Sequence, residues 1–278
     1  MFFIMQKQQI LQTADGSQTL FSQEHNETYH SSSGALKEAF SKFCEPCKIS
    51  ELAQRGAINI LDIGFGLGYN LLAALHMVKA ANSFCTIEIT SLEKEILSPQ
   101  TLNSITVPQK YSIDYEIIKK AANALSCNEK GVKISILKGD ARKTIRELTN
   151  RYDAVFFDPF SVKKNPEMWS VDFFREIGKR MTDEAILATY SASTPIRCGL
   201  IEAGFRIGPA PGDGMKKEGT LASKKGDVGG FSNKIMLRLK NSPERMPFYD
   251  PELNFSRHEI FNYRKELLQK ESSYTQKN

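Results

Sequence analysis

The sequence predicts an α/β fold, in which a mostly parallel, doubly wound, Rossmann-like sheet carries helices on both faces. The 278 residues, 41% hydrophobic and 25% charged, are enough for one enlarged α/β domain with a single core. Apolar runs of strand length alternate with helical segments, which is typical of a parallel sheet. A glycine-rich turn directly follows the first run. The six runs span residues 58–63, 85–92, 132–137, 152–157, 185–190 and 234–239.

The predicted helices have apolar residues three or four positions apart. They cover residues 34–43, 71–79, 115–125, 143–149 and 256–269, the last with Ser256 at its N-cap. The helix over 115–125 lies in an unusually long connection, 95–131, between the second and third runs.

The regions that flank the six runs lack this alternation. We expect residues 1–56 to form an N-terminal extension that packs on a core domain, residues 57–240. Residues 241–278 are polar and are expected to form a C-terminal helical tail.

No segment predicts a membrane span or a secretory signal. The longest apolar runs are strand-sized, well below the roughly 18 residues that cross a bilayer. The N-terminus becomes polar at Gln6 and has neither a basic start nor a small-residue cleavage site. We therefore expect a cytoplasmic protein.

The five cysteines predict neither a disulfide framework nor a metal site. Their number is odd, in a chain long enough to bury a core. Cys44 and Cys47 have the spacing of a metal-binding pair, but no second Cys or His pair follows at finger spacing. His25 and His30 complete a site only if the chain folds back. Reduced surface cysteines are the expectation.

The formal net charge of +5 is unevenly distributed. Residues 206–278 hold 14 Lys or Arg against 9 Asp or Glu, whereas the first 205 residues balance at 23 against 23. Such an excess suits a polyanionic partner such as nucleic acid, and equally a solvated face that keeps the protein in solution. Charge alone leaves both interpretations open.

The glycine-rich turn indicates the cofactor. Residues 62–70 read Asp-Ile-Gly-Phe-Gly-Leu-Gly-Tyr-Asn. A dinucleotide fingerprint has its third glycine one residue later, and tight strand-to-helix packing also uses glycine. The acidic start and the alternate glycines resemble motif I of class I S-adenosylmethionine-dependent methyltransferases. The resemblance implies S-adenosylmethionine as cofactor, bound by Asp62, Gly64, Gly66, Gly68 and Asn70.

Acidic residues also stand where the next three strands end. Glu93 ends the second run, where a carboxylate can accept both ribose hydroxyls of a nucleoside lying across the strand tips. Asp140, followed by Ala141, can take the adenine amino group, although capping of the next helix explains it too. Asp158 ends the fourth run, over the position expected for the transferred methyl group. Four acidic strand ends favour a methyltransferase.

Residues 157–169 carry a more specific resemblance. They read Phe-Asp-Pro-Phe-Ser-Val-Lys-Lys-Asn-Pro-Glu-Met-Trp and resemble the Asp-x-Phe-x-Pro-x-x-Asn-Pro-x-Met-Trp motif in the methyltransferase part of the MnmC family, which acts in tRNA 5-methylaminomethyl-2-thiouridine biosynthesis. Further resemblance lies in residues 13–20, 27–35, 216–223 and 247–254. The sequence departs from the family at Ser161-Val162-Lys163, which lacks a proline, and over 95–131, for which we align no counterpart.

The resemblance implies an activity and a partner. Bifunctional members add a flavin oxidase, for which this chain is too short and lacks a flavin-binding motif, so a stand-alone methyltransferase is expected. It would N-methylate the 5-aminomethyl group of wobble uridine or 2-thiouridine in tRNA. A separate enzyme must then make the aminomethyl precursor.

Roles for individual side chains follow from the resemblance and from the chemistry. Asp158 is the candidate to bind and deprotonate the substrate ammonium, which cannot attack a methyl group while protonated. Phe160 and Trp169 are candidates to stack on the uridine or wall the methyl pocket, with a core role as the alternative for Trp169. Tyr29 and His30 are candidates to close over cofactor or base, or else pack the N-terminus.

Two lysine pairs are candidates for phosphate contacts. Lys163 and Lys164 follow Asp158, and Lys216 and Lys217 lie in a late loop. A solvated surface role is the alternative for both pairs.

Two other functional classes remain open. One is a small-molecule amine methyltransferase, or an aminopropyltransferase of the spermidine-synthase type, which also uses a Tyr-His pair and a glycine turn. The other is an RNA-binding module without catalysis. The acidic strand ends disfavour the second, and the basic C-terminal region with the Asn-Pro-x-Met-Trp motif disfavours the first.

Overall fold

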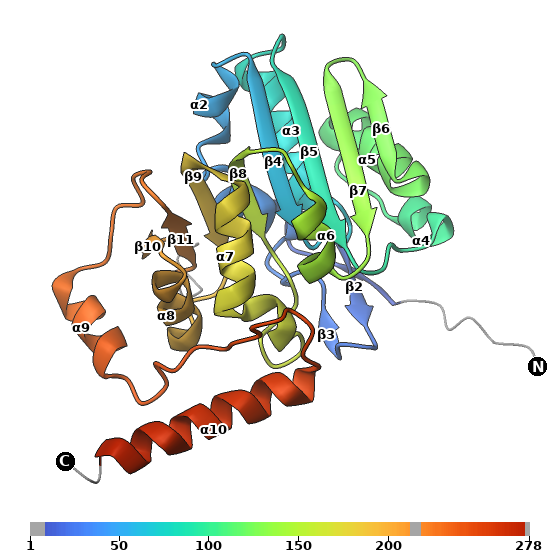
Figure 1. Cartoon of the computed structure of the whole chain (residues 1–278). Helices are drawn as coiled ribbons and strands as arrows, with labels where there is room; N and C mark the ends of the chain where they lie inside the picture. The colour runs from blue at the N-terminus through green and yellow to red at the C-terminus, as the bar shows by residue number, and fades with distance from the viewer. Residues whose placement is uncertain (1–8, 212–217, 276–278) are drawn as a thin grey trace, which may run out of the picture.

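The computed structural model describes residues 9–211 and 218–275 and confirms the predicted α/β fold. Its main sheet has the order β10-β11-β9-β8-β4-β5-β7-β6 (Figure 1). Five central strands are parallel: β4 (Ala57–Ile63), β5 (Thr86–Glu93), β7 (Val132–Lys138), β8 (Tyr152–Phe157) and β9 (Met181–Thr189). The edges are antiparallel: β6 (Ser126–Glu129), β10 (Arg206–Pro209) and β11 (Thr220–Ser223).

Helices cover both faces of this sheet, as a doubly wound fold requires (Figure 1). Along β4, Ile60 packs into the core on one face and Leu61 into the core on the other. The first face carries α3 (Tyr69–Ala81) and α5 (Ser112–Ala124), and the second carries α6 (Ala141–Glu147), α7 (Val171–Arg180) and α8 (Thr194–Glu202). None of the helices in the two described ranges has the length and apolar character needed to cross a membrane.

The N-terminal residues form a small unit beside the main sheet. Strands β1 (Ile10–Gln12), β2 (Gln18–Ser22) and β3 (Glu27–Thr28) make an antiparallel meander, and α2 (Ile49–Ala53) precedes β4. The helix predicted over 34–43 is present as α1 (Ala35–Glu38), continued by a π-helix η1 (Ala39–Cys44). Wide π turns are frequent near functional sites.

One predicted strand is wrong. Residues 234–239 lie in the helix α9 (Asn233–Asn241), because Ser232 caps the segment by accepting a hydrogen bond from the Ile235 N–H, and Ile235 and Leu239 share one helix face. The short strands β10 and β11 were not predicted. The connection 95–131 carries α4 (Pro99–Ser104), a 3₁₀ turn η2 (Gln109–Tyr111), α5 and β6.

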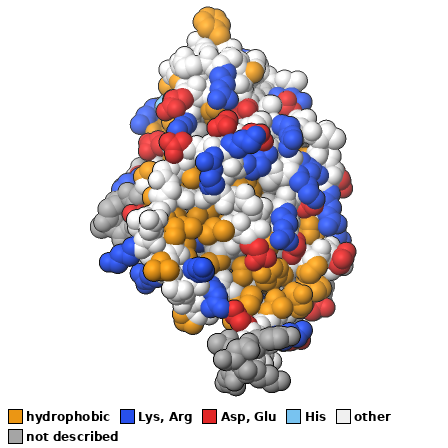
Figure 2. Space-filling view, turned by 60° about the vertical axis from the view of Figure 1, so that its left-hand side comes forward, with side chains coloured by type: hydrophobic (Ala, Val, Ile, Leu, Met, Phe, Trp, Pro, Cys, Tyr) orange, Lys and Arg blue, Asp and Glu red, His pale blue; other side chains and the backbone are white. Residues whose placement is uncertain are grey.

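The C-terminal helix α10 (Arg257–Thr275) confirms the predicted cap. Ser256 accepts from the Glu259 N–H at 3.4 Å, and the Ser256 N–H donates to the Glu259 carboxylate at 2.7 Å. The buried Asp250 carboxylate accepts from Arg142 of α6 at 2.6 Å, which ties the segment before α10 to the core. Figure 2 shows that basic side chains on the turned-forward side are mixed with acidic and apolar ones.

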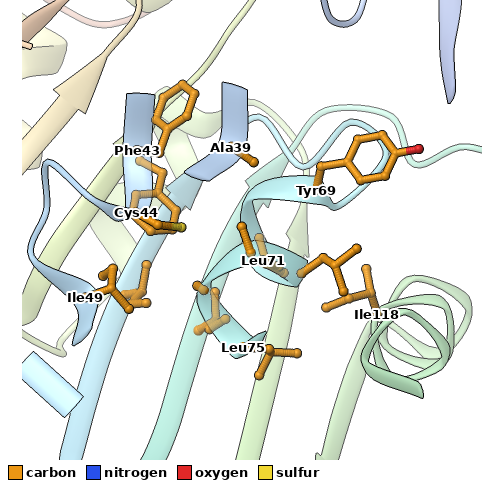
Figure 3. Close-up of a cluster of buried hydrophobic side chains, with 14 of the residues drawn as sticks. Ala39, Phe43, Cys44, Ile49, Tyr69, Leu71, Leu75 and Ile118 are labelled. Carbon is orange, nitrogen blue, oxygen red and sulfur yellow. The ribbon is translucent and has the colours of Figure 1, made fainter. Parts of the chain in front are cut away.

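The two motif-spaced cysteines lie inside the core, which corrects the expectation of surface cysteines. Cys44 packs among Ile49, Leu71 and other apolar side chains on the face of the sheet that carries α3 (Figure 3). The Cys47 thiol donates to the Ile186 carbonyl at 3.3 Å. Burial raises the pKa of both thiols, so both stay protonated at neutral pH.

The contact between Gly68 and α5 gives a test of this core. Gly68 has φ +77°, and a Cβ there would lie 2.4 Å from Ile118 Cγ2. We expect Gly68→Ala to lower the free energy of unfolding by about 2–5 kcal/mol, from overpacking and backbone strain combined. Gly56→Ala is the matched control, because Gly56 has φ +83° and open space around its Cβ position. Equal losses for the two variants in urea unfolding would contradict this packing.

Candidate active site

A cavity of about 870 Å³ lies at the carboxyl ends of the parallel strands. Its walls include Gly64 after β4, Glu93 at the end of β5, Asp140 after β7 and Asp158 after β8. The β2–β3 hairpin lies below the same strand ends (Figure 1) and contributes the opposite wall. The sequence-predicted strand tips therefore meet in one place, as the topology of an open parallel sheet requires.

The glycine turn is pressed against the turn that carries Asp158. Gly64 has φ +100°, and a Cβ there would lie 2.7 Å from the Asp158 carbonyl oxygen. The Asp158 N–H donates to the Ile63 carbonyl at 2.9 Å, so β4 and β8 stay paired up to the cavity. Gly64 and Gly66 line the cavity, whereas Gly68 packs on α5.

Asp62 supports the turn from behind and does not line the cavity. It is fully buried, and its Oδ2 accepts from the Ser91 hydroxyl at 2.5 Å. Burial raises its pKa well above the ordinary range. The expected direct contact of Asp62 with the cofactor is therefore corrected to a supporting role.

The Glu93 carboxylate is held at the cavity wall by two backbone donors. It accepts from the Gly66 N–H at 3.2 Å and from the Glu95 N–H at 3.0 Å. Burial raises its pKa despite these bonds. The remaining lone pairs can accept the two hydroxyls of a ribose, as expected for this position.

Asp140 and Ala141 line the cavity, and Asp140 also caps α6. Its carboxylate accepts from the Arg142 N–H and lies 2.7 Å from the Arg142 guanidinium. Burial alone would raise the pKa of Asp140, but these contacts hold it below its ordinary value. Both interpretations of this residue, cap and cavity wall, thus fit the structure.

Asp158 faces the cavity with one side-chain donor on it. The Asn70 amide, from the start of α3, donates to its Oδ2 at 3.0 Å. Burial raises the pKa of Asp158 to about 8. Asn70 also lines the cavity, so the last residue of the glycine motif connects the cofactor turn to the candidate base.

Two aromatic donors hold the turn that follows Asp158. The Tyr190 hydroxyl donates to the Pro159 carbonyl at 2.8 Å, and Trp169 Nε1 donates to the Phe160 carbonyl at 2.9 Å. Trp169 is the last residue of the 3₁₀ turn η3 (Pro166–Trp169), which precedes α7. Its side chain is only 1% exposed. It does not line the cavity, so its expected stacking on uridine is corrected to a core role.

The hairpin wall is aromatic. Tyr29 lies against the glycine turn, 3.3 Å from a Cβ placed on Gly66, and its ring meets Phe160 edge-on at 5.2 Å. His25, which the sequence did not single out, stacks on Phe160 with ring centroids 4.0 Å apart. His30 bonds Thr19, and burial lowers its pKa to about 4, so it is neutral at pH 7.

Lys163 and Lys164 contribute little to this cavity. Lys163 is exposed, Lys164 is half-buried, and neither lines it. Lys216 and Lys217 lie outside the described residues. A lysine that sequence reasoning missed, Lys42 of η1, does line the cavity and pairs with Glu38 at 2.6 Å. Glu38 and Lys42 are four residues apart in a predicted helix, and this spacing was the sequence signal for their ion pair.

The cavity is strongly acidic. Among the described residues, its basic side chains are Lys42, Lys94 and Arg142, and its acidic ones are Glu24, Glu27, Glu38, Glu93, Glu95, Asp140, Asp158 and Glu167. An excess of carboxylates in a partly desolvated space favours cationic ligands. S-adenosylmethionine, with its sulfonium and ribose, fits a glycine-rich turn, the Glu93 acceptor and this charge.

Comparisons with known proteins agree with the geometry. A family model for S-adenosyl-L-methionine-dependent methyltransferases matches residues 106–225. It includes residues 106–131, for which we expected no counterpart. The crystal structure of MnmC2 from Aquifex aeolicus superposes with a TM-score of 0.88 at 36% identity, over 96% of this chain and 87% of that one.

Two curated relatives extend the comparison. An uncharacterized protein of Methanocaldococcus jannaschii is 33% identical, over 94% of this chain and 72% of its own length. The tRNA 5-methylaminomethyl-2-thiouridine biosynthesis bifunctional protein MnmC of Ralstonia nicotianae is 28% identical over 74% of this chain. This chain spans about a third (33%) of that bifunctional protein's length.

Fold, glycine turn and family model together define a class I S-adenosylmethionine-dependent methyltransferase. Within that class, the chain belongs to the MnmC-like methyltransferase family and resembles MnmC2 from Aquifex aeolicus.

The Glu93 geometry generates a binding test. We expect Glu93→Ala to weaken S-adenosylmethionine binding about tenfold or more, because a charged acceptor for the ribose is lost. Glu95→Ala is the matched control, since Glu95 lines the same cavity with an exposed side chain. Calorimetry measures both affinities, and circular dichroism checks the fold. Unchanged affinity in folded Glu93→Ala removes this residue from the cofactor site.

Proposed function

We propose that the chain N-methylates the 5-aminomethyl group of wobble uridine or 2-thiouridine in tRNA, giving 5-methylaminomethyl(-2-thio)uridine. The observation that carries this proposal is the Asp158 carboxyl at the tip of β8, in an acidic cavity beside the glycine turn. The name of the MnmC relatives, tRNA 5-methylaminomethyl-2-thiouridine biosynthesis bifunctional protein, supports the choice of substrate.

The acidic cavity suits an amine better than a neutral acceptor. An aliphatic amine is mostly protonated at neutral pH and arrives as a cation. S-adenosylmethionine, when bound, supplies a methyl group on a positively charged sulfur and leaves as a neutral thioether. The cavity carboxylates reduce the repulsion between the two positive charges.

Asp158 is placed to take up the proton that the amine must lose. Its carboxylate form can accept the ammonium N–H and orient the nitrogen, and it becomes the neutral acid as the nitrogen lone pair is freed. Asn70 fixes one carboxylate oxygen and leaves the other for the amine. Alignment of the amine with the methyl group supplies the remaining rate enhancement.

Nucleoside analysis tests the proposal directly. The full chain is incubated with labelled S-adenosylmethionine and tRNA that carries 5-aminomethyluridine at the wobble position. We expect label in 5-methylaminomethyluridine, detected by mass spectrometry of digested tRNA. Label in free amines but not in tRNA would instead assign a small-molecule methyltransferase.

The raised pKa of Asp158 predicts the pH dependence. A carboxyl with a pKa of about 8 gains its basic form as pH rises, so the wild-type rate should increase with pH up to about 8. A bound sulfonium favours the carboxylate and would lower this pKa, so the rate should level off at or somewhat below about pH 8. Asp158→Asn should lower turnover about 10² or more at pH 7. Its cofactor affinity should stay within a few-fold.

High pH should restore part of the activity of Asp158→Asn, because more of the amine is then already deprotonated. Single-turnover rates from pH 6 to 10 measure this. A near wild-type rate for Asp158→Asn at neutral pH shows that the carboxyl is structural.

A further inference from the structure

Three polar side-chain atoms in one cavity wall have no hydrogen-bond partner in the described part of the chain. They are His25 Nδ1, Asn165 Oδ1 and Glu167 Oε2, and all three atoms are shielded from solvent. Buried polar atoms in folded proteins are nearly always paired, so a cluster of unpaired ones needs an explanation. All three residues line the active-site cavity.

One of the three residues contacts Phe160, two positions after Asp158, and the other two lie a few residues further along the chain. His25 stacks on the Phe160 ring. Asn165 immediately precedes the 3₁₀ turn η3, and Glu167 lies in it. The last residue of η3, Trp169, donates a hydrogen bond to the Phe160 carbonyl. None of them belongs to the strand tips on which the cofactor site is built. The cluster therefore lies on the part of the wall formed by the hairpin and the segment after the candidate base.

We propose that this wall reads the edge of the target base and selects uracil over cytosine, an inference that rests on the function proposed above. Uracil presents an N3–H donor between two carbonyl acceptors. The Glu167 carboxylate accepts the N3–H, and the Asn165 amide, which carries both a donor and an acceptor, pairs with the adjoining edge. Glu167 is only partly buried, so its carboxylate can turn toward a base in the cavity.

Cytosine has an unprotonated N3 at the same place. Its lone pair would face the Glu167 carboxylate, and two acceptors repel each other. A site built to bond a substrate N–H rejects analogues that lack it, because the buried protein group is then left unpaired. This also accounts for the unpaired Glu167 Oε2 in the protein alone, since the missing donor arrives with the substrate.

The test compares two anticodon stem-loop RNAs that differ only in the wobble base, 5-aminomethyluridine or 5-aminomethylcytidine. We expect the wild type to favour the uridine RNA in kcat/KM at least tenfold. Glu167→Gln should reduce that preference about tenfold, because its amide can donate to the cytosine N3. Glu24→Gln is the matched control: Glu24 lines the same cavity but pairs with Lys94, and its preference should not change.

The possible results of this test separate the base-selection inference from the proposed function. Equal wild-type rates on the two RNAs overturn the inference but leave the proposed function standing, and this comparison needs no variant to fold. Weaker S-adenosylmethionine binding by Glu167→Gln, with the base preference kept, assigns the wall to the cofactor and overturns the inference. Failure to methylate the uridine RNA at all overturns the proposed function itself.

Discussion

The close approach of two backbone turns is the constraint on which the site depends. The Cβ position of Gly64 lies 2.7 Å from the Asp158 carbonyl oxygen, so no other residue fits without moving the β4 and β8 ends apart. Because the Asp158 N–H also bonds Ile63, the turn that faces the cofactor and the turn that bears the candidate base form one rigid unit. Methyl transfer requires alignment within fractions of an ångström, and this unit supplies it.

Charge burial is the second constraint. Desolvation raises the pKa of Asp62, Glu93 and Asp158, yet each carboxyl keeps at least one hydrogen-bond donor that holds it in place. Such a cavity is unfavourable for the protein alone and becomes favourable when cations enter it. Stability given up at the strand tips would thus be recovered on binding the cofactor sulfonium and, under the proposed function, the substrate ammonium.

The sequence predicted the elements whose signals are local. The five parallel strands contain apolar-rich runs of strand length, and the acids at the ends of four of them follow from chain position alone. The edge strands were missed because Arg-Ile-Gly-Pro has no strand pattern, and pairing with β11 defines it. Residues 234–239 were misassigned because a short apolar run fits strand and helix alike.

Within the site, the missed features depend on contacts between distant segments. Asn70 and Asp158 are 88 residues apart, and no motif states that they bond. His25 joins the cavity only because the β2–β3 hairpin folds under the strand tips, and Lys42 because a π-helix turns it inward. Residues at strand ends were predictable from the sequence pattern, whereas in the N-terminal unit Tyr29 and His30 were named from the resemblance and His25 was missed.

The hydrogen bonds of the turn after Asp158 limit which of its atoms could hold the amine of the proposed substrate. The Pro159 carbonyl accepts from Tyr190, and the Phe160 carbonyl from Trp169. The Ser161 carbonyl accepts two backbone N–H groups. The backbone carbonyls of residues 159–161 thus already accept hydrogen bonds, whereas the Asp158 carboxylate has a side-chain donor, Asn70, on one of its two oxygens. Under the proposed function, the amine would be bound and deprotonated by the same group, which would tie recognition of the cation to its activation.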